Sequence, residues 1–522
     1  MSETISASNL AELMASNSLF AVFDVRERGE FNECQIASAT SLPRSQIEFR
    51  MAQLVPHRKV PIVVYDEGGE RALLAAKTLT EVGYERVSIL DGGLAAWQRE
   101  GRSTVSGVNV PSKAFGEKVH QERSIPEIAA EELDELQRLS GDLVILDVRT
   151  PEEYRRFCIP GGVNVPGGDL VLWAEELKRR TNATIVVNCA GRTRSIIGTA
   201  TLRRLGLTNV RALKNGTMGW VLAGLDLERE PSRTELAVPP SSHAQAISLA
   251  WRLAAEESIT WISPLQLSSS IGRMNDGVTY LIDVRSAREY ESGHVPGSLN
   301  IPGGQAVQRA DDFIAVRNAQ IIFISNESAR AVMAAYWYRQ MGFPNVTVLQ
   351  GGLVAWSESG GKLESGAQPK EPAGIEAAKR AARWIDAKTL DQQMRGQSLL
   401  VLDVGTSLEF EKSHLPRARW ISRGWIEVEL PKRFPDRKQM IVITCTDGQQ
   451  SIFAARTLVE IGYTDVSILE GGVRAWAEAG LPTEKGLEGC LVRPNDVVLS
   501  PSIRGTKEDM QQYLEWELKL VW

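Results

Sequence analysis

Two cysteines, Cys189 and Cys445, stand at equivalent places of a recurring pattern, each directly after an apolar run and before a helical stretch. A tight loop between a strand and a helix points its backbone N–H groups into one concavity, beside the positive end of the helix. Such a cradle stabilises a thiolate, so we expect a lowered pKa for Cys189. The same N–H groups would hold the terminal sulfur of a Cys–S–S⁻ intermediate.

The residues after Cys189 fit this chemistry. They read Ala-Gly-Arg-Thr-Arg-Ser. Gly191 permits the backbone angles that a curled loop needs. Arg192 and Arg194 add positive charge able to hold a divalent sulfur oxyanion.

The cysteine position occurs four times along the chain, each time 42 residues after an aspartate that ends an apolar run. Only two of the four copies have cysteine there. The other two have a carboxylate and a hydroxyl, neither of which forms a persulfide, so we expect the first and third copies to be inactive. The four pairs are Asp24 and Asp66, Asp147 and Cys189, Asp283 and Ser325, and Asp403 and Cys445.

A second landmark fixes the length of the repeat. A glycine-rich turn and a tryptophan follow each aspartate, and the distance from the aspartate to the tryptophan is 73 residues in all four copies. We expect these tryptophans to close the core of each copy rather than to bind a substrate. They are Trp97, Trp220, Trp356 and Trp476.

Within each copy, short apolar runs such as 62–65 and 441–444 alternate with amphipathic stretches such as 71–82 and 195–205. Continuous apolar strands between helices are typical of a parallel sheet that is covered on both faces. The predicted fold class is therefore α/β, with four tandem domains, each a mainly parallel sheet with helices on both faces. The loops beyond the carboxyl ends of the strands are the expected site.

The repeat predicts domains over 1–108, 109–235, 236–368 and 369–490, with a tail over 491–522. The segments 103–122, 229–243 and 360–374 are polar or irregular and are expected to be linkers. Near the end of the tail, apolar residues such as Leu514, Trp516 and Leu518 occupy every second position. This alternation favours a half-buried strand that docks on another domain.

Composition excludes several classes of protein. The formal net charge of -6 gives no reason to expect nucleic acid as a partner. The sequence has no long apolar run to span a membrane, and the first residues do not resemble a secretory signal. Five scattered cysteines suggest neither a zinc site nor a disulfide framework, so reduced thiols and a cytoplasmic location are expected.

The strand ending in Asp-Val-Arg, the Cys189 loop and the closing glycine-rich turn with its tryptophan resemble the rhodanese (thiosulfate sulfurtransferase) family, in particular its bacterial tandem-domain members. The resemblance covers nearly the whole chain, four times over. It implies that Cys189 takes sulfane sulfur from thiosulfate and passes it to cyanide or to a thiol, a protein thiol included. It implies no metal and no organic cofactor.

The resemblance also suggests roles for the neighbouring residues. The backbone of Ala190, Gly191, Arg192, Thr193, Arg194 and Ser195 would form the cradle, and the two arginines would bind the donor. Asp147, Arg149 and Glu153 are expected to brace the loop rather than react. Cys445 is a candidate second site, but its loop has Gln450 in place of the second arginine, and Gly405 replaces the arginine after Asp-Val.

Three other functions compete with this one. A phosphatase or arsenate reductase would use a similar cysteine and arginine, but four residues separate Cys189 from Arg194 where such phosphatase loops have five. A scaffold or sulfur-sensing protein would explain the two copies without cysteine. A 3-mercaptopyruvate sulfurtransferase would differ only in its donor, and the two arginines favour a dianionic inorganic one.

Overall fold

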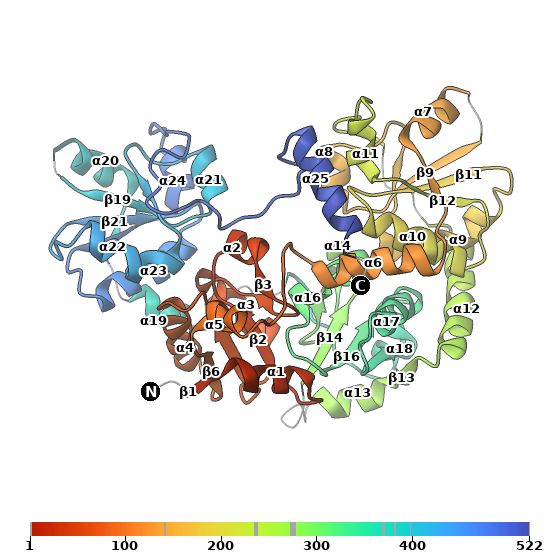
Figure 1. Cartoon of the computed structure of the whole chain (residues 1–522), viewed down its shortest axis with the longest axis horizontal. Coiled ribbons are helices and arrows are strands. Elements are labelled where there is room, and N and C mark those ends of the chain that lie inside the picture. The colour runs from red at the N-terminus through yellow and green to blue at the C-terminus, as the bar shows by residue number, and fades with distance from the viewer. Residues whose placement is uncertain are drawn as a thin grey trace. The chain divides into compact units, whose positions relative to one another are not determined.

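The computed structural model describes residues 3–139, 142–233, 238–271, 278–367, 371–380, 383–396 and 398–520. The chain divides into two compact units. One comprises Met1–Val108, Ala315–Arg317 and Lys370–Val498, and the other comprises Asn109–Ile314, Asn318–Pro369 and Leu499–Trp522. The first and fourth repeats thus belong to one unit, and the second and third repeats, with the C-terminal segment, belong to the other (Figure 1).

Each repeat forms a five-stranded parallel sheet, and the four sheets share one strand order. In the second repeat, β9 (Leu143–Asp147) lies between β10 (Val163–Asn164) and β11 (Thr184–Asn188). Beyond β11 come β12 (Val210–Leu213) and β8 (Glu127–Ile128). The carboxyl ends of β9 and β11 therefore meet at one edge of the sheet. This arrangement confirms the predicted α/β class.

The first and fourth repeats contain the following elements. The first has β1 (Glu3–Ile5), α1 (Ala7–Ala15), β2 (Ala21–Asp24), α2 (Arg28–Glu33), β3 (Gln35–Ile36), β4 (Thr40–Ser41), α3 (Ile47–Leu54), β5 (Ile62–Tyr65), α4 (Arg71–Glu81), β6 (Val87–Leu90), α5 (Gly93–Arg99) and β7 (Thr104–Val105). The fourth has α19 (Ile375–Lys379), β18 (Arg383–Ile385), α20 (Ala387–Gly396), β19 (Leu400–Asp403), α21 (Ser407–Lys412), β20 (Arg419–Trp420), α22 (Ile426–Arg433), β21 (Ile441–Thr444), α23 (Gln449–Glu460), β22 (Val466–Leu469) and α24 (Gly472–Glu478).

The other unit is built in the same way. Besides its strands, the second repeat has α6 (Val110–Glu122), α7 (Ala130–Arg138), α8 (Pro151–Arg156), α9 (Leu170–Lys178), α10 (Thr193–Arg204) and α11 (Gly216–Leu222). The third has α12 (Pro240–Glu256), β13 (Thr260–Ile262), α13 (Pro264–Ile271), β14 (Thr279–Asp283), α14 (Ala287–Ser292), β15 (Leu299–Asn300), α15 (Gly303–Gln308), α16 (Ala310–Phe313), β16 (Gln320–Ile324), α17 (Ala329–Gln340), β17 (Val346–Leu349) and α18 (Gly352–Glu358). None of the described helices combines the length and the apolarity needed to cross a bilayer.

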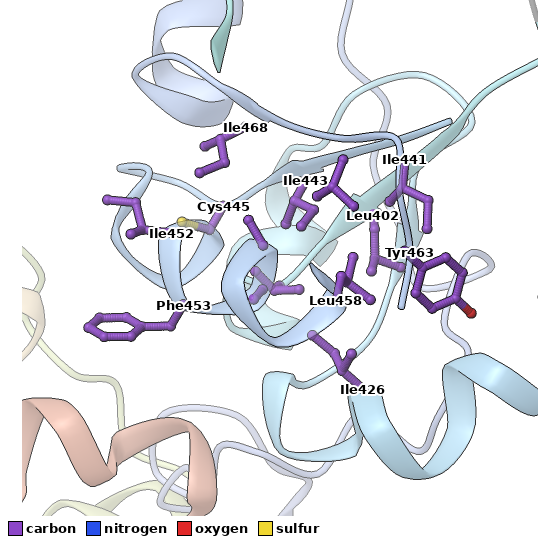
Figure 2. Close-up of a cluster of buried hydrophobic side chains, with 14 of the residues drawn as sticks. Leu402, Ile426, Ile441, Ile443, Cys445, Ile452, Phe453, Leu458, Tyr463 and Ile468 are labelled. Carbon is purple, nitrogen blue, oxygen red and sulfur yellow. The ribbon is translucent and has the colours of Figure 1, made fainter. Parts of the chain in front are cut away.

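The central strands are buried on both faces, as their continuous apolar runs predict. All four residues of β21 are buried. Figure 2 shows Ile441 and Ile443 of this strand packed with Ile426, Leu458 and neighbouring side chains. Cys445, at the end of β21, belongs to the same cluster. The apolar core of the sheet thus extends directly to the position of the candidate nucleophile.

The recurring tryptophans are core residues, as the sequence predicts. Each is buried, and its indole N–H donates to a backbone carbonyl six residues further along the chain. Trp220, for example, donates to the carbonyl oxygen of Asp226 at 2.9 Å. This bond fixes the chain segment that leaves each repeat.

Two of the segments that were expected to be linkers contain helices. α6 occupies most of 103–122 and packs on α10. α12 begins within 229–243 and packs on α9 and α17. The polar appearance of α6 was misleading because Lys113 and Glu117 are buried together with its apolar residues.

The end of the tail is helical, and the strand predicted there was wrong. α25 (Lys507–Leu518) begins with a capping box, in which Thr506 Oγ1 accepts from the N–H of Asp509 at 3.1 Å. Its buried residues Met510, Leu514 and Glu517 follow helical spacing. α25 packs on α11 and α6 of the second repeat (Figure 1). Trp522, with which the alternating row ends, lies outside the described residues. The domain boundaries stay a prediction.

Candidate active site

The loop after the central strand of each five-stranded sheet forms the candidate site. Cys189 follows β11 directly, and α10 begins four residues later at Thr193. The position therefore lies at the carboxyl edge of a parallel sheet and close to a helix N-terminus. Asp66, Ser325 and Cys445 have the same place after β5, β16 and β21.

The glycine-rich turn after β12 packs against the carbonyl groups of this loop. Gly216 has a φ of 55°, and a Cβ there would overlap the carbonyl oxygen of Cys189. The N–H groups of Thr217 and Met218 donate to the carbonyls of Cys189 and Ala190 at 2.8 and 3.0 Å. The turn thus holds the loop's carbonyl oxygens, and only glycine allows the approach.

The first repeat shows what the loop presents to an anion. Asp66 Oδ1 accepts from the N–H groups of Gly68 and Gly69 at 2.7 and 2.9 Å. Its Oδ2 accepts from the N–H of Ala72 at 3.0 Å. The carboxylate occupies the place of the cysteine side chain, so it stands in for a negatively charged sulfur. Two backbone donors of the loop and one from the first turn of α4 thus converge on it.

Cys189 itself is deeply buried, with 2% of its surface exposed. Its thiol lies 3.5 Å from Ser195 Oγ, and that hydroxyl donates to the carbonyl of Arg192 at 2.8 Å. Burial raises the pKa of Cys189, although the charge of Arg194 and the hydrogen bonds of Ser195 oppose the shift. The predicted lowering of this pKa was therefore wrong for the arrangement described here, because burial outweighs the cradle.

The two loop arginines are paired with carboxylates. Arg194 donates to both oxygens of Glu153 at 2.6 and 2.8 Å. Burial would raise the pKa of Glu153, but the Arg194 guanidinium lowers it to about 2. Arg192 donates to both oxygens of Glu117 at 2.7 and 2.9 Å and to Glu127 at 3.2 Å. The proposed binding of the donor by these arginines stays a prediction.

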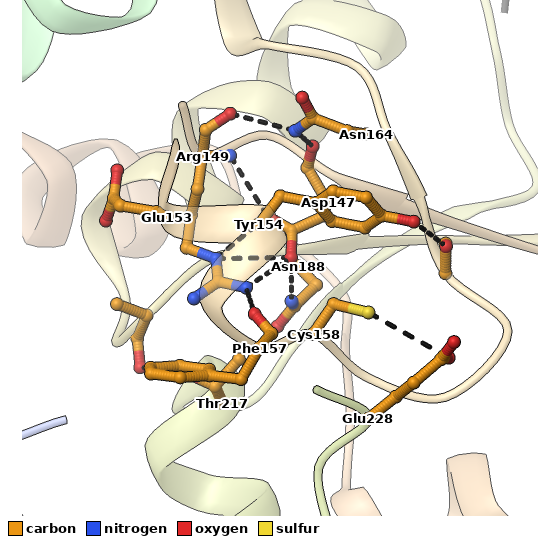
Figure 3. Close-up of polar contacts among 12 residues, drawn as sticks. Asp147, Arg149, Glu153, Tyr154, Phe157, Cys158, Asn164, Asn188, Thr217 and Glu228 are labelled. Atoms are coloured by element: carbon orange, nitrogen blue, oxygen red, sulfur yellow. Dashed lines mark hydrogen bonds and ion pairs between the residues drawn. The ribbon is translucent and has the colours of Figure 1, made fainter. Parts of the chain in front are cut away.

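Asp147 and Arg149 tie the neighbouring strand ends together (Figure 3). Arg149 donates from Nε and Nη2 to the Asp147 carboxylate at 2.9 and 2.7 Å, and from Nη2 to the carbonyl of Phe157. Asn188, the residue before Cys189, donates to the same carboxylate at 3.3 Å. Both members of the pair are 1% exposed. These contacts fix the strand end from which the Cys189 loop departs.

The fourth repeat keeps the cysteine but loses this pair. Asp403 is 2% exposed and accepts from the N–H of Gly405 at 2.8 Å. Gly405 offers no guanidinium, and the indole of Trp420 donates to its carbonyl at 2.9 Å. Burial without a cation raises the pKa of Asp403 to about 7. This repeat therefore contains a buried acid where the others have an ion pair.

The surroundings of Cys445 consequently disfavour its thiolate, which is the reactive form of a cysteine. Burial raises its pKa to about 11, and the carboxyl groups of Asp403 and Asp447 add to the shift. Gln450, which replaces the second arginine, donates to the carbonyl of Ser45 at 3.1 Å. Cys445 as a second site stays a prediction.

Sequence reasoning missed the contribution of α25. Thr193 donates its hydroxyl to Glu517 Oε1 at 2.7 Å, and Glu517 is 2% exposed. Tyr513, one turn earlier, and the cluster of Met218, Met510 and Leu514 lie beside it. The only signal was the spacing of Met510, Leu514 and Glu517, which places the acid on the apolar face of a helix.

Comparison with known sequences agrees with this geometry. The family model of the rhodanese-like domain matches residues 6–100, 129–223, 268–359 and 386–479. The chain belongs to the rhodanese family. Each of its rhodanese repeats includes the sheet, the loop and the closing turn described above.

The four-repeat rhodanese also resembles proteins of known structure or name. The crystal structure of a thiosulfate sulfurtransferase from Pseudomonas aeruginosa is 37% identical, with a TM-score of 0.91, over 99% of this chain and 97% of that one. A thiosulfate sulfurtransferase of Azotobacter vinelandii is 31% identical over 32% of this chain and 58% of its own length. A Mycobacterium tuberculosis relative named SseB is 33% identical over 22% of this chain and 42% of its own length. The chain thus matches about half of the length of these last two relatives.

Proposed function

We propose that this rhodanese is a sulfurtransferase in which Cys189 carries sulfane sulfur from thiosulfate to a thiol or to cyanide. The Cys189 thiolate attacks the outer sulfur of thiosulfate, the S–S bond of thiosulfate breaks, and sulfite leaves. Cys189 is then a persulfide. An acceptor attacks its terminal sulfur, and Cys189 leaves again as a thiolate. Neither step needs an external oxidant or reductant.

The observation that carries this proposal is the carboxylate of Asp66. In the first repeat, two N–H groups of the loop and one from the first turn of α4 donate to a negative group at the cysteine position. In the second repeat the terminal sulfur of a Cys189 persulfide would take that place. Oriented backbone donors of this kind stabilise a developing anion without reorganising.

The length of the Cys189 loop supports sulfur transfer over phosphate chemistry. Four residues separate Cys189 from Arg194, where phosphatase loops of this type have five and need room for a tetrahedral oxyanion. The thiosulfate sulfurtransferase names of the Pseudomonas and Azotobacter proteins support thiosulfate as the donor.

Intact-mass measurement tests the proposal. The wild type, Cys189→Ser and Cys445→Ser are each incubated with thiosulfate. After the excess donor is removed, the intact mass of each protein is measured. We expect one added sulfur atom on the wild type and on Cys445→Ser, and none on Cys189→Ser. If no form gains sulfur from thiosulfate or from 3-mercaptopyruvate, a scaffold or sulfur-sensing function replaces this one. If only 3-mercaptopyruvate loads Cys189, the donor is wrong.

A further inference from the structure

The carboxyl group of Glu517 lies on the Cys189 loop, although it comes from the far end of the chain. Its Oε1 accepts the Thr193 hydroxyl at 2.7 Å. Its Oε2 would lie 3.3 Å from a Cβ placed on Gly191. The side chain is thus held by one loop residue and directed at another, within two residues of Cys189.

Oε2 of Glu517 has no hydrogen-bond partner among the described residues, although the side chain is 98% buried. An acceptor oxygen left unpaired in a buried place is costly, and such atoms in native proteins call for an explanation. A proton donor that enters the site during the reaction would supply the missing partner.

Three other carboxylates near the loop have both oxygens occupied by an arginine. Both oxygens of Glu117 accept from Arg192, both of Glu153 accept from Arg194, and both of Asp147 accept from Arg149. An oxygen that already accepts from a guanidinium is poorly placed to take a proton from an acceptor, and for Glu153 the pairing also lowers the pKa. Of these four acids, only Glu517 has an oxygen without a partner.

The surroundings of Glu517 favour proton uptake. Burial raises its pKa, and the charge of Glu117 adds to the shift, whereas Lys113, the Thr193 hydroxyl and Arg192 oppose it. Tyr513 and Cys189 are the other titratable groups beside it, and the charge of Glu517 raises the pKa of both. A general base works best when its pKa is close to the working pH.

We propose that Glu517 is the catalytic base that removes the proton of a thiol acceptor when the Cys189 persulfide transfers its sulfur. This inference rests on the proposed sulfurtransferase function. The acceptor's S–H proton moves to Oε2 as its sulfur attacks the terminal persulfide sulfur. A new S–S bond forms, the bond between that sulfur and Cys189 Sγ breaks, and its electron pair leaves Sγ as a thiolate. The total charge is unchanged.

The proposal predicts a selective defect. The free cyanide anion has no proton to lose, so its attack needs no base when the rate is referred to the concentration of the anion rather than of hydrogen cyanide. A strongly acidic thiol such as trifluoroethanethiol also attacks largely as its thiolate. A residue with a merely structural role would instead slow every acceptor alike.

The experiment compares single-turnover discharge of purified persulfide enzyme by 2-mercaptoethanol, trifluoroethanethiol and cyanide. Glu517→Gln keeps the size of the side chain and an oxygen for the Thr193 hydroxyl. We expect discharge to 2-mercaptoethanol to slow on the order of 100-fold, as for loss of a general base. Discharge to cyanide and to trifluoroethanethiol should stay close to the wild-type rate. Glu515→Gln, an exposed position of the same helix, is the matched control and should behave as wild type.

The pH dependence gives a second readout. Without the base, discharge to 2-mercaptoethanol depends on preformed thiolate, so below the pKa of the thiol the Glu517→Gln rate should rise tenfold per pH unit. The wild-type rate should rise less steeply. Equal slowing with all three acceptors, or no slowing with any, would overturn the inference while leaving the persulfide intact. If the wild type forms no persulfide, the proposed function fails and the inference falls with it.

Discussion

Replacing Asp403 by asparagine should stabilise the fourth rhodanese repeat at neutral and alkaline pH. In the other three repeats an arginine two residues after the equivalent aspartate neutralises it, as Arg149 does for Asp147. Gly405 leaves Asp403 buried without such a partner. Asparagine keeps the oxygen that accepts from the N–H of Gly405 and removes the charge.

The magnitude follows from the pKa of Asp403, which burial raises from 3.8 to about 7. Each pH unit of difference corresponds to about 1.4 kcal/mol, so the buried charge costs up to about 4 kcal/mol. Below pH 3.8 both the folded and the unfolded chain bind the proton, and nothing is lost. As the pH rises to about 7, the unfolded chain releases its proton first, so the folded repeat loses stability. Between pH 5 and 8 this loss is about 2.5 kcal/mol.

Hydrogen exchange measured by mass spectrometry can follow this loss in the whole chain. Global unfolding of four domains is not two-state, whereas peptides from β19 and β21 report local opening. After correction for intrinsic exchange rates, the opening free energy of these peptides should fall between pH 5 and 8 in the wild type, and it should fall by about 2.5 kcal/mol less in Asp403→Asn. Peptides from β9 serve as an internal control. Equal pH slopes in the two proteins, or lower stability of Asp403→Asn at pH 8, would refute the reasoning.

Two further predictions concern the second repeat. Glu117→Ala should destabilise it by about 3 kcal/mol, because Arg192 then keeps only Glu127 as a carboxylate partner in a buried site. Faster hydrogen exchange in α6 and α10 would show this loss of stability, and unchanged exchange would contradict it. A chain that ends before Thr506 lacks α25, and its Cys189 should react with iodoacetamide at least about tenfold faster than in the full chain. Cys445 in the same sample should keep its rate, and equal Cys189 rates in the two chains would show that α25 does not shield the thiol.

Most of the framework could be predicted from the sequence, because its signals are local. Continuous apolar runs predicted strands at 62–65 and 441–444, and β5 and β21 have those bounds. The constant distance from aspartate to tryptophan reflects one topology repeated four times. The position of Cys189 after β11 follows from the same pattern.

The electrostatics of the site could not be predicted, because the partners are remote in the sequence. Arg192 pairs with Glu117, 75 residues earlier, on a helix that the polarity of 103–122 concealed. Glu517 lies 324 residues from Thr193. The Cys189 thiol was expected to be more acidic than it is because the backbone donors of the loop can be predicted from the sequence, whereas the burial that outweighs them cannot.

Comparison of the four repeats shows which ion pairs occur without a cysteine at the site position. The first and third repeats lack the cysteine, yet both keep the arginine on the strand-end aspartate and the loop arginine on the helix glutamate. These pairs are Arg26–Asp24, Arg71–Glu30, Arg285–Asp283 and Arg330–Glu289. The fourth repeat keeps Cys445 and has neither arginine. Because these pairs are present in repeats that cannot form a persulfide, their role in those repeats is not sulfur transfer. We infer that Asp147, Arg149 and Glu153 likewise hold the edge of their sheet, and that reactivity in the second repeat depends on the backbone of the Cys189 loop and on what α25 adds to it.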